Sequence, residues 1–177
     1  MSIEDITIVI TSFKSNNKIN SCLDSINRKA KVIVIENSGS QSLKKSIEKK
    51  YKNVECIISE ENLGYAKGNN LGLGKVNTKY ALVLNPDTVL QNNALENFLT
   101  TASKYKDFSL IGPYSNNENK NQELENIIEV ENLKGFAIFF NMKKFEKNEF
   151  FDENYFLYFE EIDLCKKVNS EKGKIYL

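Results

Sequence analysis

The 177-residue sequence contains no histidine and no tryptophan, and it has only three cysteines and two prolines. The absence of histidine excludes Ser-His and Cys-His catalytic pairs and every histidine-ligated metal site. Cys22, Cys56 and Cys165 lie far apart and form no C-x-x-C pair, which argues against a disulfide framework or a zinc knuckle and is typical of a reducing cytoplasm. Catalysis by this chain would therefore rest on carboxylates, lysines or tyrosines.

The chain also lacks a net charge and a long apolar run. Its 24 Lys and Arg residues balance 24 Asp and Glu residues, and the pI of about 6.4 argues against nucleic acid as a partner. No stretch approaches the roughly 18 apolar residues that span a bilayer, and the first residues, MSIEDITIVI, do not resemble a signal peptide. We expect a cytoplasmic protein with at most peripheral contact with the inner face of the membrane, and the composition sets no oligomeric state.

The composition that remains, with 41% hydrophobic and 27% charged residues, is that of one soluble domain covering residues 1–177. Short β-branched runs alternate with amphipathic segments, which predicts an α/β fold with a mostly parallel central sheet. The expected strands are 6–10, 32–35, 54–58, 80–84, 109–111, 133–142 and 174–177. The expected helices are 19–26, 40–50, a weak one within 60–74, 93–104 and one starting near residue 159. Residues 114–126 are expected to form a mobile loop.

Polar clusters follow four of these strands, where ligands of open α/β sheets bind. The clusters are Thr11-Ser12-Phe13, Glu36-Asn37-Ser38, Asn62 to Asn69, and Asn85-Pro86-Asp87-Thr88. G-x-G-x-x-G and P-loop patterns are absent, which argues against a dinucleotide or P-loop site. Asp87 lies on a proline-fixed turn, where it is suited to a divalent cation that neutralises a diphosphate, and a simple Asx turn is the alternative.

Seven segments in order carry a family resemblance. They are ITIVITSFKS, CLDSI, VIVIENSGS, ENLGYAKGNNLGL, YALVLNPDT, LKGFAIFF and FFDENYFLYFEEIDLCKK. Together they resemble the inverting, nucleotide-sugar-dependent glycosyltransferases of family 2, which have the GT-A fold, and within them the rhamnosyltransferase-like group. The resemblance implies a Rossmann-like sheet in which residues 1–112 bind the donor and residues 113–177 form the acceptor side.

The resemblance also implies an activity of the hexosyltransferase type. A sugar, with rhamnose as a candidate, would pass with inversion from a nucleoside diphosphate sugar to a saccharide or lipid-linked saccharide acceptor, in bacterial cell-surface polysaccharide synthesis. The implied cofactor is Mg2+ or Mn2+. Relatives usually continue further and carry another metal-binding histidine, so the sequence indicates a truncated chain or a short, inactive member.

Donor-side residues follow from the matched motifs. Thr11, Phe13 and Glu36 match positions that cradle the nucleobase and ribose, with Glu36 where Asp is usual; a solvated turn acid is the alternative for Glu36. The N-x-G-[FY]-x-x-G-N segment that lines the donor site is matched by Asn62, Gly64, Tyr65, Gly68 and Asn69. Free N–H groups at a helix start there would suit anions, and a Gly-capped surface loop is the alternative. Asn85 and Asp87 occupy the D-x-D position, with Asp87 as the metal ligand.

On the acceptor side, Gly135 and Phe136 match the strand where a small residue leaves room for a sugar. Aromatic residues there could stack on sugar rings, but most are expected in the core; they are Phe151, Tyr155, Phe156, Tyr158 and Phe159. We also expect Cys22 and Cys165 in the core.

Three acids, Glu160, Glu161 and Asp163, compete for the role of base that inversion requires. Helical spacing places Glu161 at the head of the apolar stripe of the last helix and Glu160 on the opposite face with Asp163. Partial burial would then raise the pKa of Glu161 towards that of a useful base. Glu161 also matches the Asp of the family's E-D-x-D-L-C segment. It is therefore the predicted base, with Asp163 as the second choice, and Glu160 suits a plain helix N-terminal acid.

Two other functions remain open from the sequence. One is a catalytically inactive nucleotide-sugar-binding module that lacks the C-terminal part. The other, more remote, is a nucleotidyltransferase, which shares the sheet architecture but calls for a basic, Gly-rich loop after the first strand. The segment TSFKSNN lacks that loop.

Overall fold

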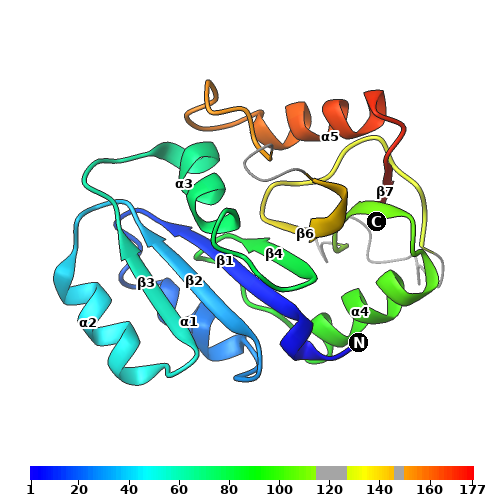
Figure 1. Ribbon diagram of the computed structural model, residues 1–177. Coiled ribbons are helices and arrows are strands. Elements are labelled where there is room, and N and C mark those ends of the chain that lie inside the picture. The colour runs from blue at the N-terminus through cyan, green and yellow to red at the C-terminus, as the bar shows by residue number, and fades with distance from the viewer. Residues whose placement is uncertain (115–126, 146–149) are drawn as a thin grey trace.

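A computed structural model describes residues 1–114, 127–145 and 150–177 (Figure 1). The strands are β1 (Ile6–Ser12), β2 (Lys31–Glu36), β3 (Val54–Ile58), β4 (Tyr80–Leu84), β5 (Phe108–Ile111), β6 (Ala137–Asn141) and β7 (Lys174–Tyr176). The α-helices are α1 (Ile19–Ser25), α2 (Gln41–Lys50), α3 (Gly64–Leu73), α4 (Ala94–Lys104) and α5 (Glu160–Ser170). The loop predicted at 114–126 falls outside the described residues except for Tyr114.

The seven described strands form one sheet in the order β3-β2-β1-β4-β6-β5-β7. β3, β2, β1 and β4 are mutually parallel, β6 runs antiparallel to both of its neighbours, and β7 is parallel to β5. The predicted α/β class is confirmed. From β1 the chain continues to β2 and β3 on one side of β1, and it then crosses to β4 on the other side. The strand order therefore reverses beside β1. Such a reversal creates a crevice at the carboxyl ends of the two strands, here β1 and β4.

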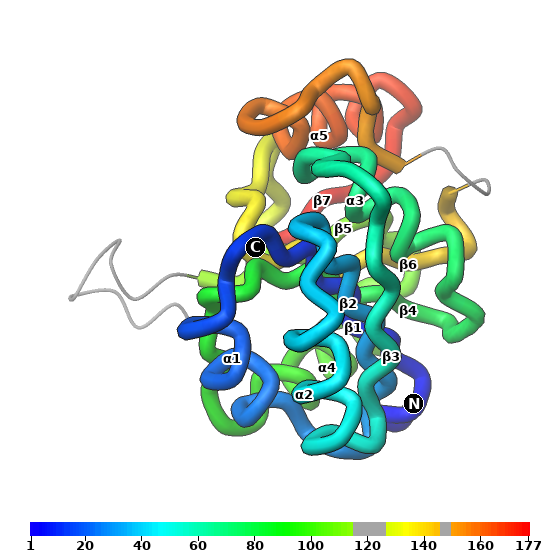
Figure 2. The backbone as a smooth tube through the Cα atoms, turned by 90° about the vertical axis from the view of Figure 1, so that its left-hand side faces the viewer, coloured from blue at the N-terminus to red at the C-terminus, as the bar shows by residue number. Residues whose placement is uncertain are grey.

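Helices cover both faces of this sheet. α1, α2 and α4 lie on one face, and α3 and α5 lie together on the other (Figures 1 and 2). β1 serves both layers, because Ile6, Ile8 and Ile10 join the first apolar cluster and Val9 joins the second. Burial on both faces is the reason that the central strands are continuous apolar runs rather than alternating ones.

The strand predicted at 133–142 is wrong at its start, because β6 begins only at Ala137. Gly135 and Phe136 form a turn instead, and the Phe136 carbonyl accepts a hydrogen bond of 2.9 Å from the Asn85 amide. The turn thus joins the acceptor-side segment to the end of β4.

The prediction that most of the aromatic run is core is also wrong. Phe151 is buried, but Phe156, Tyr158 and Phe159 are 56%, 70% and 66% exposed. They lie in the loop before α5, where Tyr158 and Phe159 have left-handed backbone conformations that delay the start of the helix to Glu160. The expected burial of Cys22 and Cys165 is confirmed.

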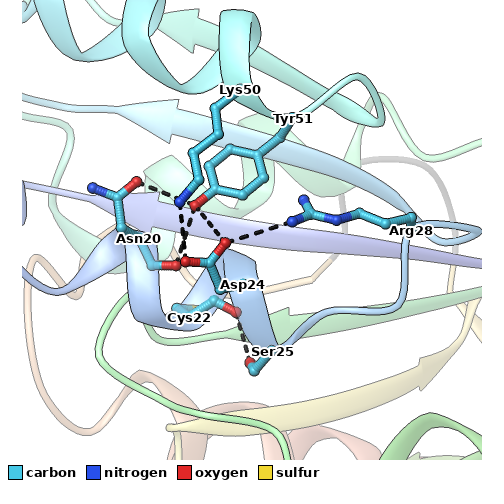
Figure 3. A network of polar contacts seen from close by, with 7 residues as sticks. All are labelled: Asn20, Cys22, Asp24, Ser25, Arg28, Lys50 and Tyr51. Carbon is cyan, nitrogen blue, oxygen red and sulfur yellow. Dashed lines mark hydrogen bonds and ion pairs between the residues drawn. The ribbon is translucent and has the colours of Figure 1, made fainter.

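A polar cluster joins α1 to the end of α2 (Figure 3). The buried Tyr51 donates its hydroxyl hydrogen to Asp24 Oδ1 at 3.0 Å, and Lys50 Nζ lies 3.0 Å from Asp24 Oδ2. The hydrogen bond from Lys50 is the main cause that lowers the pKa of Asp24.

Candidate functional site

The polar ends of β1 and β2 meet α3 directly. Thr11 and Ser12 end β1, and the Thr11 hydroxyl donates to Asn69 Oδ1 on α3 at 2.9 Å. A Cβ atom added at Gly68 would lie 2.7 Å from Thr11 Cγ2, so the close approach of helix and strand requires glycine there. The structure therefore brings together Thr11, Gly68 and Asn69, which the sequence predicts as donor-side residues.

The start of α3 is held by its neighbours. Gly64 has a φ of +72°; its N–H donates to Asn62 Oδ1 at 3.1 Å, and its carbonyl accepts from Asn37 Nδ2 at 3.0 Å. The Tyr65 N–H donates to the Phe156 carbonyl at 2.8 Å. The expectation of free N–H groups at this helix start is thus wrong for its first two residues.

The alternative of a Gly-capped surface loop is also wrong for most of this segment: of its five motif residues, Gly64, Gly68 and Asn69 are buried and Asn62 alone is exposed. Sequence reasoning missed Asn37 as a link to α3. Asn37 lies in a turn-forming tetrapeptide, and that local pattern gives no sign that its side chain bonds to the distant Gly64 carbonyl.

Glu36 is fully buried, which overturns its alternative interpretation as a solvated turn acid. Its carboxylate accepts hydrogen bonds from the Ser38 N–H at 3.1 Å, the Ser40 N–H at 2.6 Å and the Ser38 hydroxyl. Both oxygens are therefore engaged by the loop that leads into α2. Contact of Glu36 with a nucleoside would require this loop to open. Phe13, by contrast, is 45% exposed at the end of β1, so its ring is accessible for stacking.

The turn after β4 presents Asp87 to solvent. The turn is closed by the backbone, since the Thr88 N–H donates to the Asn85 carbonyl at 3.1 Å. The half-exposed Asp87 carboxylate pairs with Lys18 Nζ at 3.3 Å, a contact between exposed groups. This ion pair links Asp87 to the loop between β1 and α1.

A resident metal is not supported by this arrangement alone. Across the three described ranges, no three Cys, Asp or Glu side chains gather where they could hold a metal ion. Asp87 supplies one carboxylate, and Asn85 beside it supplies an amide. Because Mg2+ and similar hard ions need about six oxygen ligands, this turn suits an ion that is held jointly with a diphosphate and water.

At the start of α5, the buried acid is Glu160 rather than Glu161. Glu160 is 4% exposed, and its Oε2 has no hydrogen-bond partner within the described part of the chain. Burial is the main cause that raises the pKa of Glu160, and the charge of Glu161 adds to it. The helical-spacing prediction is wrong for Glu160, which is buried four positions before Leu164, whereas Glu161, four positions before the equally buried Cys165, is only partly buried.

Glu161 is partly exposed and lies beside the turn at Gly135. A Cβ atom added at Gly135 would meet Glu161 Cδ at 3.5 Å. Glu160 and Glu161 are also the acids whose charges raise the pKa of Tyr65, after the larger effect of burial. The carboxyl groups at the start of α5 therefore face the turn at Gly135 and the side chain of Tyr65.

Replacement of Gly135 by Ala is expected to leave the fold intact and to impair any reaction at Glu161. The added methyl would make only ordinary contacts of 3.5–3.6 Å with the Glu161 side chain, so the free energy of unfolding should change by less than about 0.5 kcal/mol. It would fill the space beside the carboxyl group. Urea unfolding and turnover of the same variant test this, and wild-type turnover would contradict the assignment of that space to a ligand.

Glu160→Gln is expected to stabilise the protein increasingly as the pH rises. The pKa of Glu160 is raised in the folded state, so its contribution to stability is fully present below the ordinary Glu value of about 4.3 and is lost as the pH rises through the folded value. Gln does not ionise, so the variant avoids the cost of burying a charge at high pH. Thermal unfolding of both proteins from pH 4 to pH 8 measures the difference, and a difference that is constant with pH would contradict burial as the cause.

Most of the predicted site residues lie outside the lining of the cavity nearest to them. A cavity of about 520 Å³ lies next to them, between the residues after β4 and helix α4. Phe136 is the one predicted site residue in its lining. Within the described residues, none of the helices has the length and apolar character needed to cross a membrane.

The family model described as glycosyl transferase family 2 matches residues 7–165. The low-salt glycan biosynthesis hexosyltransferase Agl10 of Haloferax volcanii is 26% identical to this chain over an alignment of 200 positions. The alignment covers 98% of this chain and 64% of that protein. The chain thus spans less than two thirds of this relative.

Two solved structures share the fold. The mannosyltransferase PcManGT from Pyrobaculum calidifontis, in complex with GDP-Man and Mn2+, aligns with a TM-score of 0.80 at 12% identity over 97% of this chain and 53% of that one. S. aureus TarS 1-349, in complex with UDP-GlcNAc, aligns with a TM-score of 0.75 at 18% identity over 97% of this chain and 55% of that one. At such low identity these structures support the GT-A fold alone.

Proposed function

Because the chain belongs to glycosyl transferase family 2, we propose that its crevice binds a nucleoside diphosphate sugar and transfers the sugar to a hydroxyl group of a saccharide or lipid-linked saccharide. The observation that carries this proposal is the convergence of the end of β1, helix α3 and the acids of α5. Thr11 contacts Asn69, and the charges of Glu160 and Glu161 act on Tyr65, one turn before Asn69 in the same helix.

Unsatisfied polar atoms support a polar ligand at this place. Ser12 Oγ and Glu160 Oε2 are buried and have no hydrogen-bond partner in the described ranges. Buried polar groups are normally paired, so such atoms call for an explanation. Hydroxyl groups of a sugar, or water molecules around it, would supply the missing partners.

In the proposed donor complex, the nucleobase stacks on the exposed ring of Phe13, and the diphosphate lies between the ends of β1 and β4. A bound Mg2+ or Mn2+ would supply positive charge to the leaving diphosphate, with Asp87 as the protein's carboxylate ligand. Lys18, which pairs with Asp87 at 3.3 Å, is a cation of the chain itself at the same place. The solved mannosyltransferase contains Mn2+ together with GDP-Man, which supports this choice of ion.

In the proposed reaction, Glu161 accepts the proton of the acceptor hydroxyl as the acceptor oxygen bonds to the anomeric carbon. The bond from that carbon to the diphosphate oxygen breaks, and the diphosphate leaves with the electron pair, which inverts the anomeric configuration. Glu161 suits this role better than Glu160 because it is partly exposed beside Gly135, whereas burial favours the protonated form of Glu160. Asp163 remains the second choice.

The biological setting is proposed from the relative's name and from the sequence resemblance. The hexosyltransferase name of the archaeal relative supports a hexose donor and a role in glycan assembly. Rhamnose as the transferred sugar and bacterial cell-surface polysaccharide as the product remain predictions from the sequence resemblance. Action on the cytoplasmic side of the membrane is a prediction of the same kind.

The test is release of nucleoside diphosphate from a panel of UDP, GDP and dTDP sugars, with Mn2+ and a mixture of saccharide acceptors. The proposal expects release with one donor class, and NMR of the product should show the inverted anomer. Binding of a nucleotide without release would instead support an inactive binding module. Consumption of a nucleoside triphosphate with a sugar phosphate would indicate a nucleotidyltransferase.

A further inference from the structure

One side chain joins the donor-side helix to the acceptor-side turn. Tyr65, the second residue of α3, donates its hydroxyl hydrogen to the Gly135 carbonyl at 2.5 Å across a separation of 70 residues. Burial raises the pKa of Tyr65 first, and the charges of Glu160 and Glu161 raise it further. The hydroxyl group therefore keeps its proton and stays a hydrogen-bond donor throughout the physiological range of pH.

The Tyr65 ring is held in place by the loop before α5. Its backbone N–H donates to Phe156, and its ring packs edge-on against Phe151 with the centroids 5.8 Å apart. Phe151 is fixed in turn by Asn70, whose side-chain amide exchanges two hydrogen bonds, of 2.8 and 3.0 Å, with the Phe151 backbone. These contacts fix the position of the Tyr65 ring and therefore of its hydroxyl group.

The turn at Gly135 is held from two sides. Tyr65 binds the carbonyl of Gly135, and the amide of Asn85 at the end of β4 binds the carbonyl of Phe136. Glu161 lies against the third side of the same turn, where only the absence of a Gly135 side chain leaves space. A small displacement of the turn would therefore change the space in front of the Glu161 carboxyl group.

We propose that Tyr65 is a positioning residue for the acceptor. By holding the Gly135 carbonyl, its hydroxyl group sets the gap between the acceptor-side turn and the Glu161 carboxylate, which is where the acceptor hydroxyl is placed for attack. This inference rests on the proposed function. Tyr65 acts through Gly135 and does not need to touch the reacting atoms.

The first test is amide hydrogen exchange of the full chain with Tyr65→Phe. This variant keeps the ring and its packing on Phe151 and loses only the hydroxyl group. We expect exchange in a peptide covering 133–137 to become about fivefold faster, as the loss of one hydrogen bond predicts. A peptide from β4 reports any change in global stability. Exchange that is unchanged at 133–137, relative to β4, would overturn the inference whether or not the protein transfers sugar.

Tyr51→Phe is the matched control, because it also removes a bonded tyrosine hydroxyl, in the cluster between α1 and α2 (Figure 3). With an active donor and acceptor pair, Tyr65→Phe should lower kcat/KM for the acceptor by roughly 10- to 100-fold, since misplacement by about 1 Å costs that much. Its nucleotide affinity should stay within about twofold of the wild type. Tyr51→Phe should change neither. Equal acceptor kinetics in Tyr65→Phe and wild type would overturn the inference while leaving the proposed function intact.

Discussion

Replacement of Glu161 by Gln is expected to lower sugar transfer by about 10²- to 10⁴-fold, the usual contribution of a general base, while nucleotide binding stays within about twofold. Gln has nearly the same shape as Glu but cannot accept the proton of the acceptor hydroxyl. The partly exposed position of Glu161 beside Gly135 means that the amide can be accommodated without burying a new unpaired group. Initial rates of nucleoside diphosphate release, measured beside calorimetric nucleotide binding, separate the two effects.

Asp163→Asn is the matched control for this prediction. Asp163 lies on the same first turn of α5, and its charge is not among the causes that raise the pKa of Tyr65, whereas the charge of Glu161 is. We expect this variant to retain most of the wild-type rate. Loss of transfer in Asp163→Asn together with retention in Glu161→Gln would make Asp163 the base.

Replacement of Gly64 by Ala is expected to lower the free energy of unfolding by about 2–4 kcal/mol, as backbone strain and overpacking together predict. Gly64 has a φ of +72°, and an added Cβ atom would lie 2.3 Å from the Phe156 carbonyl oxygen. The atom in the way belongs to the backbone, so a side-chain rotation cannot relieve the clash. Urea unfolding followed by circular dichroism measures the loss.

Gly39→Ala separates backbone strain from packing. Gly39 has nearly the same conformation, with a φ of +73°, but an added Cβ atom there meets nothing within 4 Å. The expected loss is therefore that of the left-handed conformation alone, about 1 kcal/mol. If both variants lost the same free energy, contact between α3 and the loop before α5 would not be the reason for glycine at position 64.

The sequence predicts most of the sheet because its central strands are covered on both faces. Short apolar segments bounded by turn residues place the central strand β4, and also the edge strand β3, with the observed bounds. The method fails at 133–142, since apolar residues before Ala137 also look like strand. The chain turns there at Gly135 and Phe136, and the Asn85 N–H donates to the Phe136 carbonyl in the register of the β4–β6 pair, a long-range contact that no local pattern shows.

For the site, the family resemblance assigns Thr11, Gly68 and Asn69 to the donor side, and the structure brings these three residues into contact. The resemblance does not predict that Glu36 would use both of its oxygens on its own loop, because that depends on how the loop closes. The greater burial of Glu160 than of Glu161 was also not predictable, for a similar reason. Burial at the first turn of a helix is decided by the loop that covers it, and helical spacing alone contains no information on that loop.

The most direct test of the account is thermal unfolding of the 177-residue chain with UDP, GDP, dTDP or CDP, each with Mn2+ or Mg2+ and again with a chelator. We expect one nucleotide to raise the free energy of unfolding by about 2.7 kcal/mol at 100 times its dissociation constant, and the effect to be larger with the metal. The unfolding temperature should rise accordingly. Unchanged unfolding with all four nucleotides at millimolar concentration would contradict the claim that this crevice binds the donor.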